Sequence, residues 1–199
     1  MKNKKLVTMV ASLALVAIVG VGATLAYFTD KDAATNVITM GHVDIELTEP
    51  SFPEDKEVTN IKPGDVIAKD PTVTVQEGSE DAYVRVKLEI TGDITDAQKA
   101  QLLEKAAGEY KYLDIDTDVW KQSGNYFYYN GVLKAGEVVT LFTEVTIPAE
   151  WDNSVADKTF NIAITAEAIQ ADNVTPIEDD GMISGWPEAA IQEYVEDVK

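Results

Sequence analysis

The chain has no cysteine, one histidine and few basic side chains among its 199 residues. Without cysteine it forms no disulfide and offers no thiolate to a metal. The single histidine, His42, excludes the H-E-x-x-H zinc motif, which needs two. Lys and Arg number 16 against 35 Asp and Glu, a formal net charge of -19 that disfavours nucleic acid as a partner. His42 has no recognisable Ser partner, so we assign no catalytic residue.

A long apolar run occurs near the N-terminus. Three lysines in MKNKK precede the apolar stretch Leu6 to Ala26, which turns small and Gly-rich at its end. This is the layout of a secretory signal peptide over residues 1–26, cut between Ala26 and Tyr27. The alternative is a permanent membrane anchor, because the apolar stretch is just long enough to span a bilayer of about 30 Å.

Strand patterns dominate after the apolar run. In YVRVKLEI, Val84, Val86, Leu88 and Ile90 alternate with polar residues, which is typical of a half-buried antiparallel strand. Similar alternation predicts strands in 43–48, 138–147 and 160–169, and shorter strands in 72–75, 110–115 and 126–129. Turn residues occur at 62–65, 134–137 and 130–131, where Asn-Gly is the strongest hairpin signal.

Two segments favour helices. Residues 95–108 begin with a Thr95 or Asp96 cap and predict a helix that stops at Gly108. The acidic tail, residues 172–199, predicts a short amphipathic helix after Pro187, and we expect this tail to be either loosely held or docked by Trp186. We therefore predict a mostly β fold for residues 43–171. It is a two-sheet antiparallel β-sandwich of jelly-roll or immunoglobulin-like type, with one inserted helix and a short C-terminal helix.

Three segments together resemble a known family. A small-residue end before Phe28-Thr29-Asp30, followed by a Gly and the first strand, is the first, and NIKPGDVIAKDPTVTV (60–75) is the second. FNIAITAEAIQADN (160–173) resembles the family's closing strand. The combination is similar to the TasA and camelysin (CalY) proteins of Gram-positive spore-formers, which the signal peptidase SipW processes during export. The tail after Asn173 lies outside the resemblance.

The resemblance implies a secreted protein of the extracellular matrix or cell surface, built into biofilm fibres. In such fibres the freed N-terminal segment of one subunit pairs as a donor strand with the next. Here that segment is residues 27–42, and its apolar side chains are Phe28, Val37, Ile38 and Met40. The implied partners are copies of the chain or paralogous matrix proteins, and SipW during export.

Two other functions stay open. Camelysin relatives are classed as metallopeptidases, so an endopeptidase is one alternative, although no zinc motif is present. A surface adhesin or carbohydrate binder that uses Tyr126, Phe127, Tyr128 and Tyr129 is the other, and cross-strand packing is the simpler interpretation of these rings. We expect a structural protein rather than an enzyme.

One acidic motif raises the question of a metal. Asp114, Asp116 and Asp118 alternate, and calcium favours such oxygen clusters. The full calcium-loop template fails, because Val119 stands where Gly is needed and Asn125 where Glu is needed. A solvated acidic face is the simpler interpretation, so calcium remains the one alternative to a chain without cofactors, and zinc is not expected.

Overall fold

The computed structural model describes residues 42–52, 58, 61–152, 155, 158–188 and 190. The predicted signal peptide, the cleavage site at Ala26 and Tyr27, and all of the donor segment except His42 lie outside the described residues, as does most of the predicted C-terminal helix. No helix in the described part of the chain is long and apolar enough to cross a membrane.

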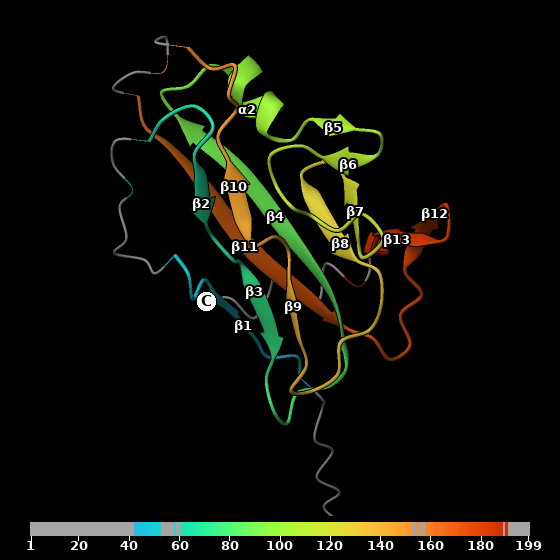
Figure 1. The fold of residues 1–199 in the computed structure, drawn as a ribbon. Coiled ribbons are helices and arrows are strands. Elements are labelled where there is room, and N and C mark those ends of the chain that lie inside the picture. Colours follow the sequence, from blue (N-terminus) through green and yellow to red (C-terminus); the bar gives the residue numbers. More distant parts are fainter. Residues whose placement is uncertain are drawn as a thin grey trace, which may run out of the picture. The chain divides into compact units, whose positions relative to one another are not determined.

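The larger layer is a four-stranded antiparallel sheet in the order β11-β4-β8-β7 (Figure 1). Its strands are β4 (Ala82–Gly92), β7 (Trp120–Ser123), β8 (Tyr126–Tyr129) and β11 (Phe160–Gln170). β4 and β11 pair along their entire length of eleven residues in one continuous register. The alternating pattern of YVRVKLEI is confirmed, because its valines and leucine are buried on one face.

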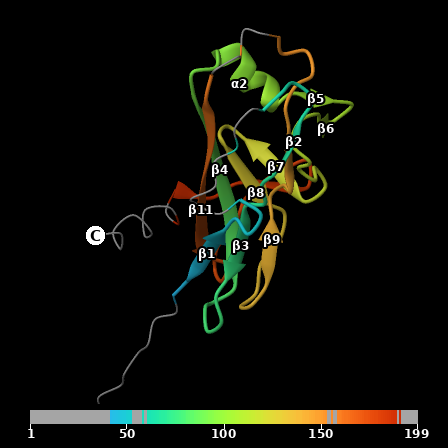
Figure 2. The same ribbon diagram turned by 60° about the vertical axis from the view of Figure 1, so that its left-hand side comes forward.

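The opposing layer consists of two smaller antiparallel sheets (Figure 2). One has the order β1-β3-β9 and contains β1 (Ile45–Thr48), β3 (Thr72–Val75) and β9 (Val138–Thr140). The other pairs β2 (Val66–Ala68) with β10 (Glu144–Thr146). Apolar side chains from both layers meet in one core that contains Val73, Val84, Trp120, Phe127, Phe142 and Val145. The predicted mostly β sandwich is therefore confirmed.

The inserted helix is shorter than predicted. α2 (Asp96–Leu102) has Thr95 as its N-cap within a complete capping box, so the predicted start is confirmed. The helix ends at Leu102, whose side chain is fully buried, and not at Gly108. Gly108 instead has φ +98° in the turn between β5 (Lys105–Ala106) and β6 (Glu109–Tyr110). That turn needs the positive φ that glycine allows.

The Asn130-Gly131 hairpin prediction is wrong. β7 and β8 form the hairpin, and its turn lies at Gly124, between the paired residues Ser123 and Tyr126. The Gly131 N–H donates to the carbonyl of Tyr129 in a tight bend that ends β8. Two strand predictions also need correction. The run 138–147 is split between β9 and β10, and 110–115 contains only the end of β6 and an isolated bridge at Leu113.

The C-terminal tail docks on the outer face of the four-stranded sheet. It forms a hairpin of β12 (Ile177–Asp179) and β13 (Met182–Gly185), which the sequence reading missed. Trp186 follows, only 5% exposed, with its ring edge-on to Tyr128 at 5.8 Å between centroids. The predicted docking by Trp186 is confirmed.

Candidate functional site

β11 presents an open strand edge. The N–H of Asp93 donates to the Thr159 carbonyl and the N–H of Ala171 to the Asp81 carbonyl, both at 2.8 Å. In an antiparallel ladder alternate residues face the partner strand, so the odd-numbered residues of β11 bond to β4. The backbone groups of the even-numbered residues point to the other edge. No strand among the described residues pairs with that edge.

This edge lacks the features by which proteins protect an exposed strand. β11 has no proline or lysine, and its pairing with β4 contains no bulge. Its one charged side chain, Glu167, pairs with Arg85 on the outer face of the sheet. The opposite edge is shorter, because β7 has only four residues, and its Lys121 pairs with Asp179 at 3.1 Å. Strand β1 lies near part of β11, although the two form no ladder. Of the two edges of the sheet, β11 is therefore the one suited to receive a strand.

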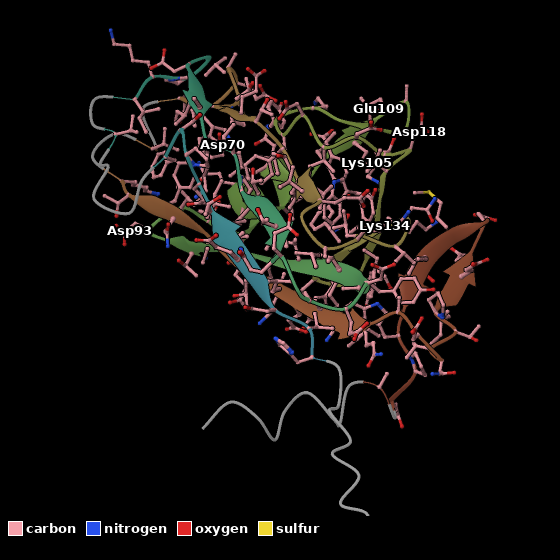
Figure 3. The ribbon with its side chains drawn as sticks, turned by 90° about the horizontal axis from the view of Figure 1, so that it is seen from below. Asp70, Asp93, Lys105, Glu109, Asp118 and Lys134 are labelled. Carbon is pink, nitrogen blue, oxygen red and sulfur yellow. The ribbon has the colours of Figure 1, made fainter. Side chains whose placement is uncertain are left out.

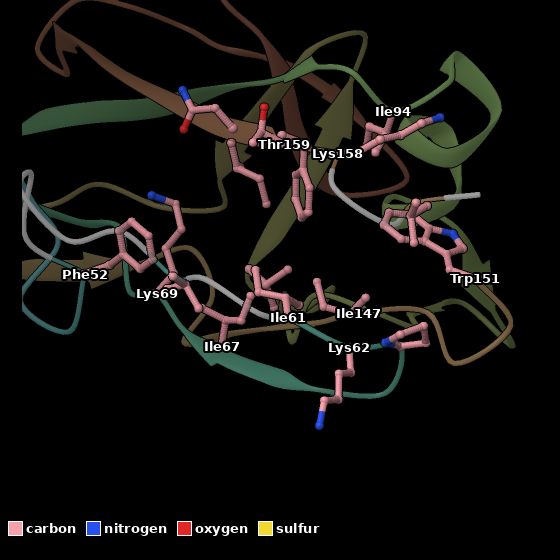
Figure 4. A pocket seen from close by; sticks show the side chains of 17 residues that line it. Phe52, Ile61, Lys62, Ile67, Lys69, Ile94, Ile147, Trp151, Lys158 and Thr159 are labelled. Atoms are coloured by element: carbon pink, nitrogen blue, oxygen red, sulfur yellow. The ribbon is translucent and has the colours of Figure 1, made fainter. Parts of the chain in front are cut away.

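An apolar groove runs along the open edge. A cavity of about 520 Å³ lies between β2 and the start of β11 (Figure 4). A second cavity of about 580 Å³ continues toward β1 and shares Phe52, Lys69, Asn161 and Ile162 with the first. We call the two together the β11 groove. Its apolar lining includes Ile61, Ile67, Ile147, Trp151, Phe160, Ile162 and Ile164.

The described charged side chains around the first cavity are basic, although the chain as a whole is acidic. Among the described residues, Lys62, Lys69 and Lys158 line the first cavity and no carboxylate does, although acidic residues outnumber basic ones by 35 to 16 in the whole chain. Lys69 is buried and pairs with Glu49 at 2.6 Å while lying 4.8 Å from the centre of the Phe52 ring. Lys62 and Lys158 are exposed, and neither pairs with a carboxylate of the described residues. The described part of the rim of the first cavity is therefore positively charged.

A hydrogen-bond network closes the groove near α2. The Trp151 indole N–H donates to Gln101 Oε1 at 2.7 Å, and Gln101 Nε2 donates to Glu150 Oε1 at 2.6 Å. The Tyr112 hydroxyl donates to the same oxygen, and this bond is the main reason that the pKa of Glu150 is lowered. The network holds Trp151 as a fixed end wall of the groove.

The three predicted calcium ligands do not come together. The Asp114 carboxylate accepts hydrogen bonds from the backbone N–H and hydroxyl of Thr143 and from the N–H of Glu144. Asp116 accepts from the N–H of Asp118, which lies at the surface near Glu109 (Figure 3). Across the described ranges, no group of three or more His, Cys, Asp or Glu side chains could hold a metal ion.

The aromatic residues of β8 are packed within the protein. Phe127 lies in the central core and Tyr129 packs against it. Tyr126 and Tyr128 lie on the outer face, where the Arg85 guanidinium is 4.0 Å from the centre of the Tyr126 ring and 4.3 Å from that of Trp186. Tyr128 is only 6% exposed. Packing accounts for these rings, and the C-terminal tail covers the face that an adhesin would need.

A zinc peptidase centre does not fit the described residues. His42 is exposed just before β1, and its carbonyl accepts a hydrogen bond from the N–H of Glu80. A catalytic zinc site needs about three protein ligands. No second histidine exists in the chain, and no cluster of carboxylates in the described part replaces it.

Neither the groove nor the open edge was found from the sequence. The groove is assembled from Phe52, the loop before β2, the end of β10 and the start of β11, which are far apart in the chain. The one available signal was the uncharged stretch FNIAITA, which lacks the lysine or proline of a protected edge.

Comparison with known proteins places the chain in a family. A search of curated proteins found no match. The family model described as camelysin metallo-endopeptidase matches residues 1–109, which include β1 to β4 and α2. The match covers more than half of the 199 residues, and the resemblance inferred from the sequence is thereby confirmed. The chain belongs to the camelysin family.

Proposed function

We propose that this protein is a secreted structural subunit of an extracellular biofilm matrix. It forms fibres when the N-terminal segment of one copy, residues 27–42, adds as a strand to β11 of the next copy or of a paralogous matrix protein. The observation that carries this proposal is the open eleven-residue edge of β11 beside an apolar groove. Family membership supports it.

Strand addition explains why the edge and the groove occur together. The backbone of an added strand bonds to the N–H and C=O groups along β11, and its side chains fill adjoining pockets. Phe28, Ile38 and Met40 supply large apolar side chains for the groove. Because the donor and the acceptor are different surfaces, the contact is head-to-tail and propagates into a filament where the rotation does not close.

The direction of β1 favours a donor that acts on a neighbour. β1 runs from Ile45 toward Glu49 and Phe52, which line the groove. A segment that precedes His42 therefore joins the domain at the end of β1 farther from these residues. To reach the groove of its own molecule, it would have to run back along β1.

Export produces the free donor. Signal peptidase cleavage between Ala26 and Tyr27 would leave an N-terminus directly before Phe28. The cut also removes three lysines, Lys2, Lys4 and Lys5, which changes the formal net charge from -19 to -22. SipW is the peptidase that the family relationship suggests.

A truncation tests the proposal. We expect the mature chain, Tyr27–Lys199, to assemble into filaments and a chain that starts at Val43 to stay monomeric, because only the first contains the donor strand. Electron microscopy and analytical ultracentrifugation at matched concentration measure the two outcomes. Adding a peptide of residues 27–42 to the truncated chain should raise its thermal stability by filling the groove.

The same experiment can contradict the proposal. Filaments formed equally by both chains would show that residues 27–42 are not needed for assembly. Circular dichroism of the truncated chain is the control for folding, since all described strands begin after residue 43.

A further inference from the structure

We propose that charge pairing selects the donor strand: Asp30 and Asp32 of one copy are recognised by Lys62 and Lys158 at the rim of the next copy's β11 groove. This inference rests on the proposed function and adds a specificity-determining set of residues to it. Three observations carry it. The charged side chains that line the first cavity are lysines among the described residues, the ammonium groups of Lys62 and Lys158 form no ion pair with a described carboxylate, and the large apolar residues of the donor favour one face of the extended segment.

The donor sequence has two different faces when it is extended. Successive side chains of a strand point to opposite sides, so the even-numbered and odd-numbered positions separate. The even face holds Phe28, Ile38 and Met40, whereas the odd face holds Tyr27 and Val37. The even face therefore enters an apolar groove. When the even-numbered side chains of the donor point into the groove, those of Asp30 and Asp32 point into it as well, and that of Lys31 points away from it.

A carboxylate that enters an apolar groove needs a cationic partner. Lys62 precedes β2 and Lys158 precedes β11, so the two lie on opposite sides of the hollow (Figure 4). Neither pairs with a carboxylate in the described part of the chain, whereas Lys69 is already paired with Glu49. Two ammonium groups are thus available for two aspartates.

The lining also rejects other strands. A neutral donor would leave the ammonium groups of Lys62 and Lys158 without a charge partner beside a strand that excludes water, which costs free energy. Specificity of this kind combines attraction for the right partner with a penalty for the wrong one. Aspartate and glutamate are common throughout this chain, so acidic residues alone would not identify a donor strand. The combination of two aspartates with Phe28, Ile38 and Met40 does.

Charge reversal with rescue tests the inference. In the mature chain we expect Lys62→Glu with Lys158→Glu to raise the concentration needed for filament formation at least ten-fold. Adding Asp30→Lys and Asp32→Lys to that variant should restore assembly, because both pairs are then reversed. Both lysines are exposed, so the fold should tolerate the changes. Sedimentation of filaments after assembly gives the threshold concentration.

A matched control separates pairing from net charge. Lys105→Glu with Lys134→Glu makes the same change in net charge at two exposed lysines that do not line the groove. Both lysines are labelled in Figure 3. This control should assemble within about two-fold of the parent, since exposed charges contribute little individually.

The possible failures are distinguishable. If the Lys62 and Lys158 variant assembles like the control, or if the four-fold variant does not regain assembly, the charge inference is overturned. The proposed function would survive that result as long as the chain that starts at Val43 remains monomeric. Assembly of that truncated chain would overturn both.

Discussion

The Asp114 carboxylate binds backbone N–H groups, whereas its sequence pattern had suggested a ligand for a metal ion. The alternation Asp114, Asp116, Asp118 suggests a cation site, but the structure uses Asp114 to bind the backbone at the start of β10. Sequence spacing could not distinguish these roles, because the partners Thr143 and Glu144 are about thirty residues away in the chain. The Thr95 capping box was predictable, since both of its members lie within four residues.

Replacing this carboxylate should reveal its contribution to stability. Partial burial acts to raise the pKa of Asp114, but hydrogen bonds from Thr143 and Glu144 outweigh it and lower the pKa below the ordinary value. A lowered folded-state pKa adds stability above the unfolded pKa, and this stability is lost as pH falls through the folded pKa. Asp114→Asn should therefore reduce the free energy of unfolding by about 1 kcal/mol at neutral pH, with a smaller loss below about pH 3.

Urea denaturation at both pH values measures this effect. Asp118→Asn is the matched control, because no hydrogen bond to the Asp118 carboxylate is formed by the described residues. An equal loss for Asp114→Asn at both pH values would mean that the carboxylate charge contributes nothing.

At the level of elements, the strands with long alternating patterns were predictable and the divided ones were not. β4 and β11 follow from period-two sequences that bury one face. VVTLFTEVTI reads as one strand, but Leu141 and Phe142 are both buried although adjacent. Successive side chains of a regular strand point to opposite faces, so two adjacent residues can both be buried in the core only where the strand is interrupted. The chain accordingly leaves one sheet after β9 and enters another at β10.

The two backbone edges of β11 allow a sharp test of strand addition. The N–H of Ala166 points to the open edge, whereas Ala163 pairs with Glu89 in the ladder to β4. Proline is tolerated in a strand where its missing N–H faces the free edge. Ala166→Pro should leave the mature chain folded, with thermal unfolding near that of the parent, while filament formation falls by at least ten-fold.

Ala163→Pro provides the contrast. It removes a hydrogen bond inside the sheet and should destabilise the fold by about 3 kcal/mol, which differential scanning calorimetry detects. If Ala166→Pro assembles normally, β11 is not the acceptor strand.

At the scale of the whole molecule, the proposed assembly has to overcome repulsion between strongly acidic copies. Without residues 1–26, as in the proposed mature form, each copy has a formal net charge of -22. The tail increases this locally, since Asp179, Asp180 and Glu188 lie near the docked hairpin. The positive rim at Lys62 and Lys158 is small in comparison, so it can orient a donor at short range but not cancel the repulsion at long range.

Salt should therefore accelerate assembly of the mature chain. The Debye length falls from about 30 Å at 0.01 M to about 10 Å at 0.1 M ionic strength, which screens repulsion between whole molecules. Ion pairs formed within the β11 groove are partly buried and are screened less. Light scattering should show a faster onset of filaments at 0.1 M than at 0.01 M NaCl. The acceleration should be larger for the Lys62→Glu, Lys158→Glu variant, whose net charge is more negative by four. Slower onset at the higher salt would mean that attraction at the groove outweighs the repulsion between copies, and that encounter is governed by the donor and its acceptor rather than by net charge.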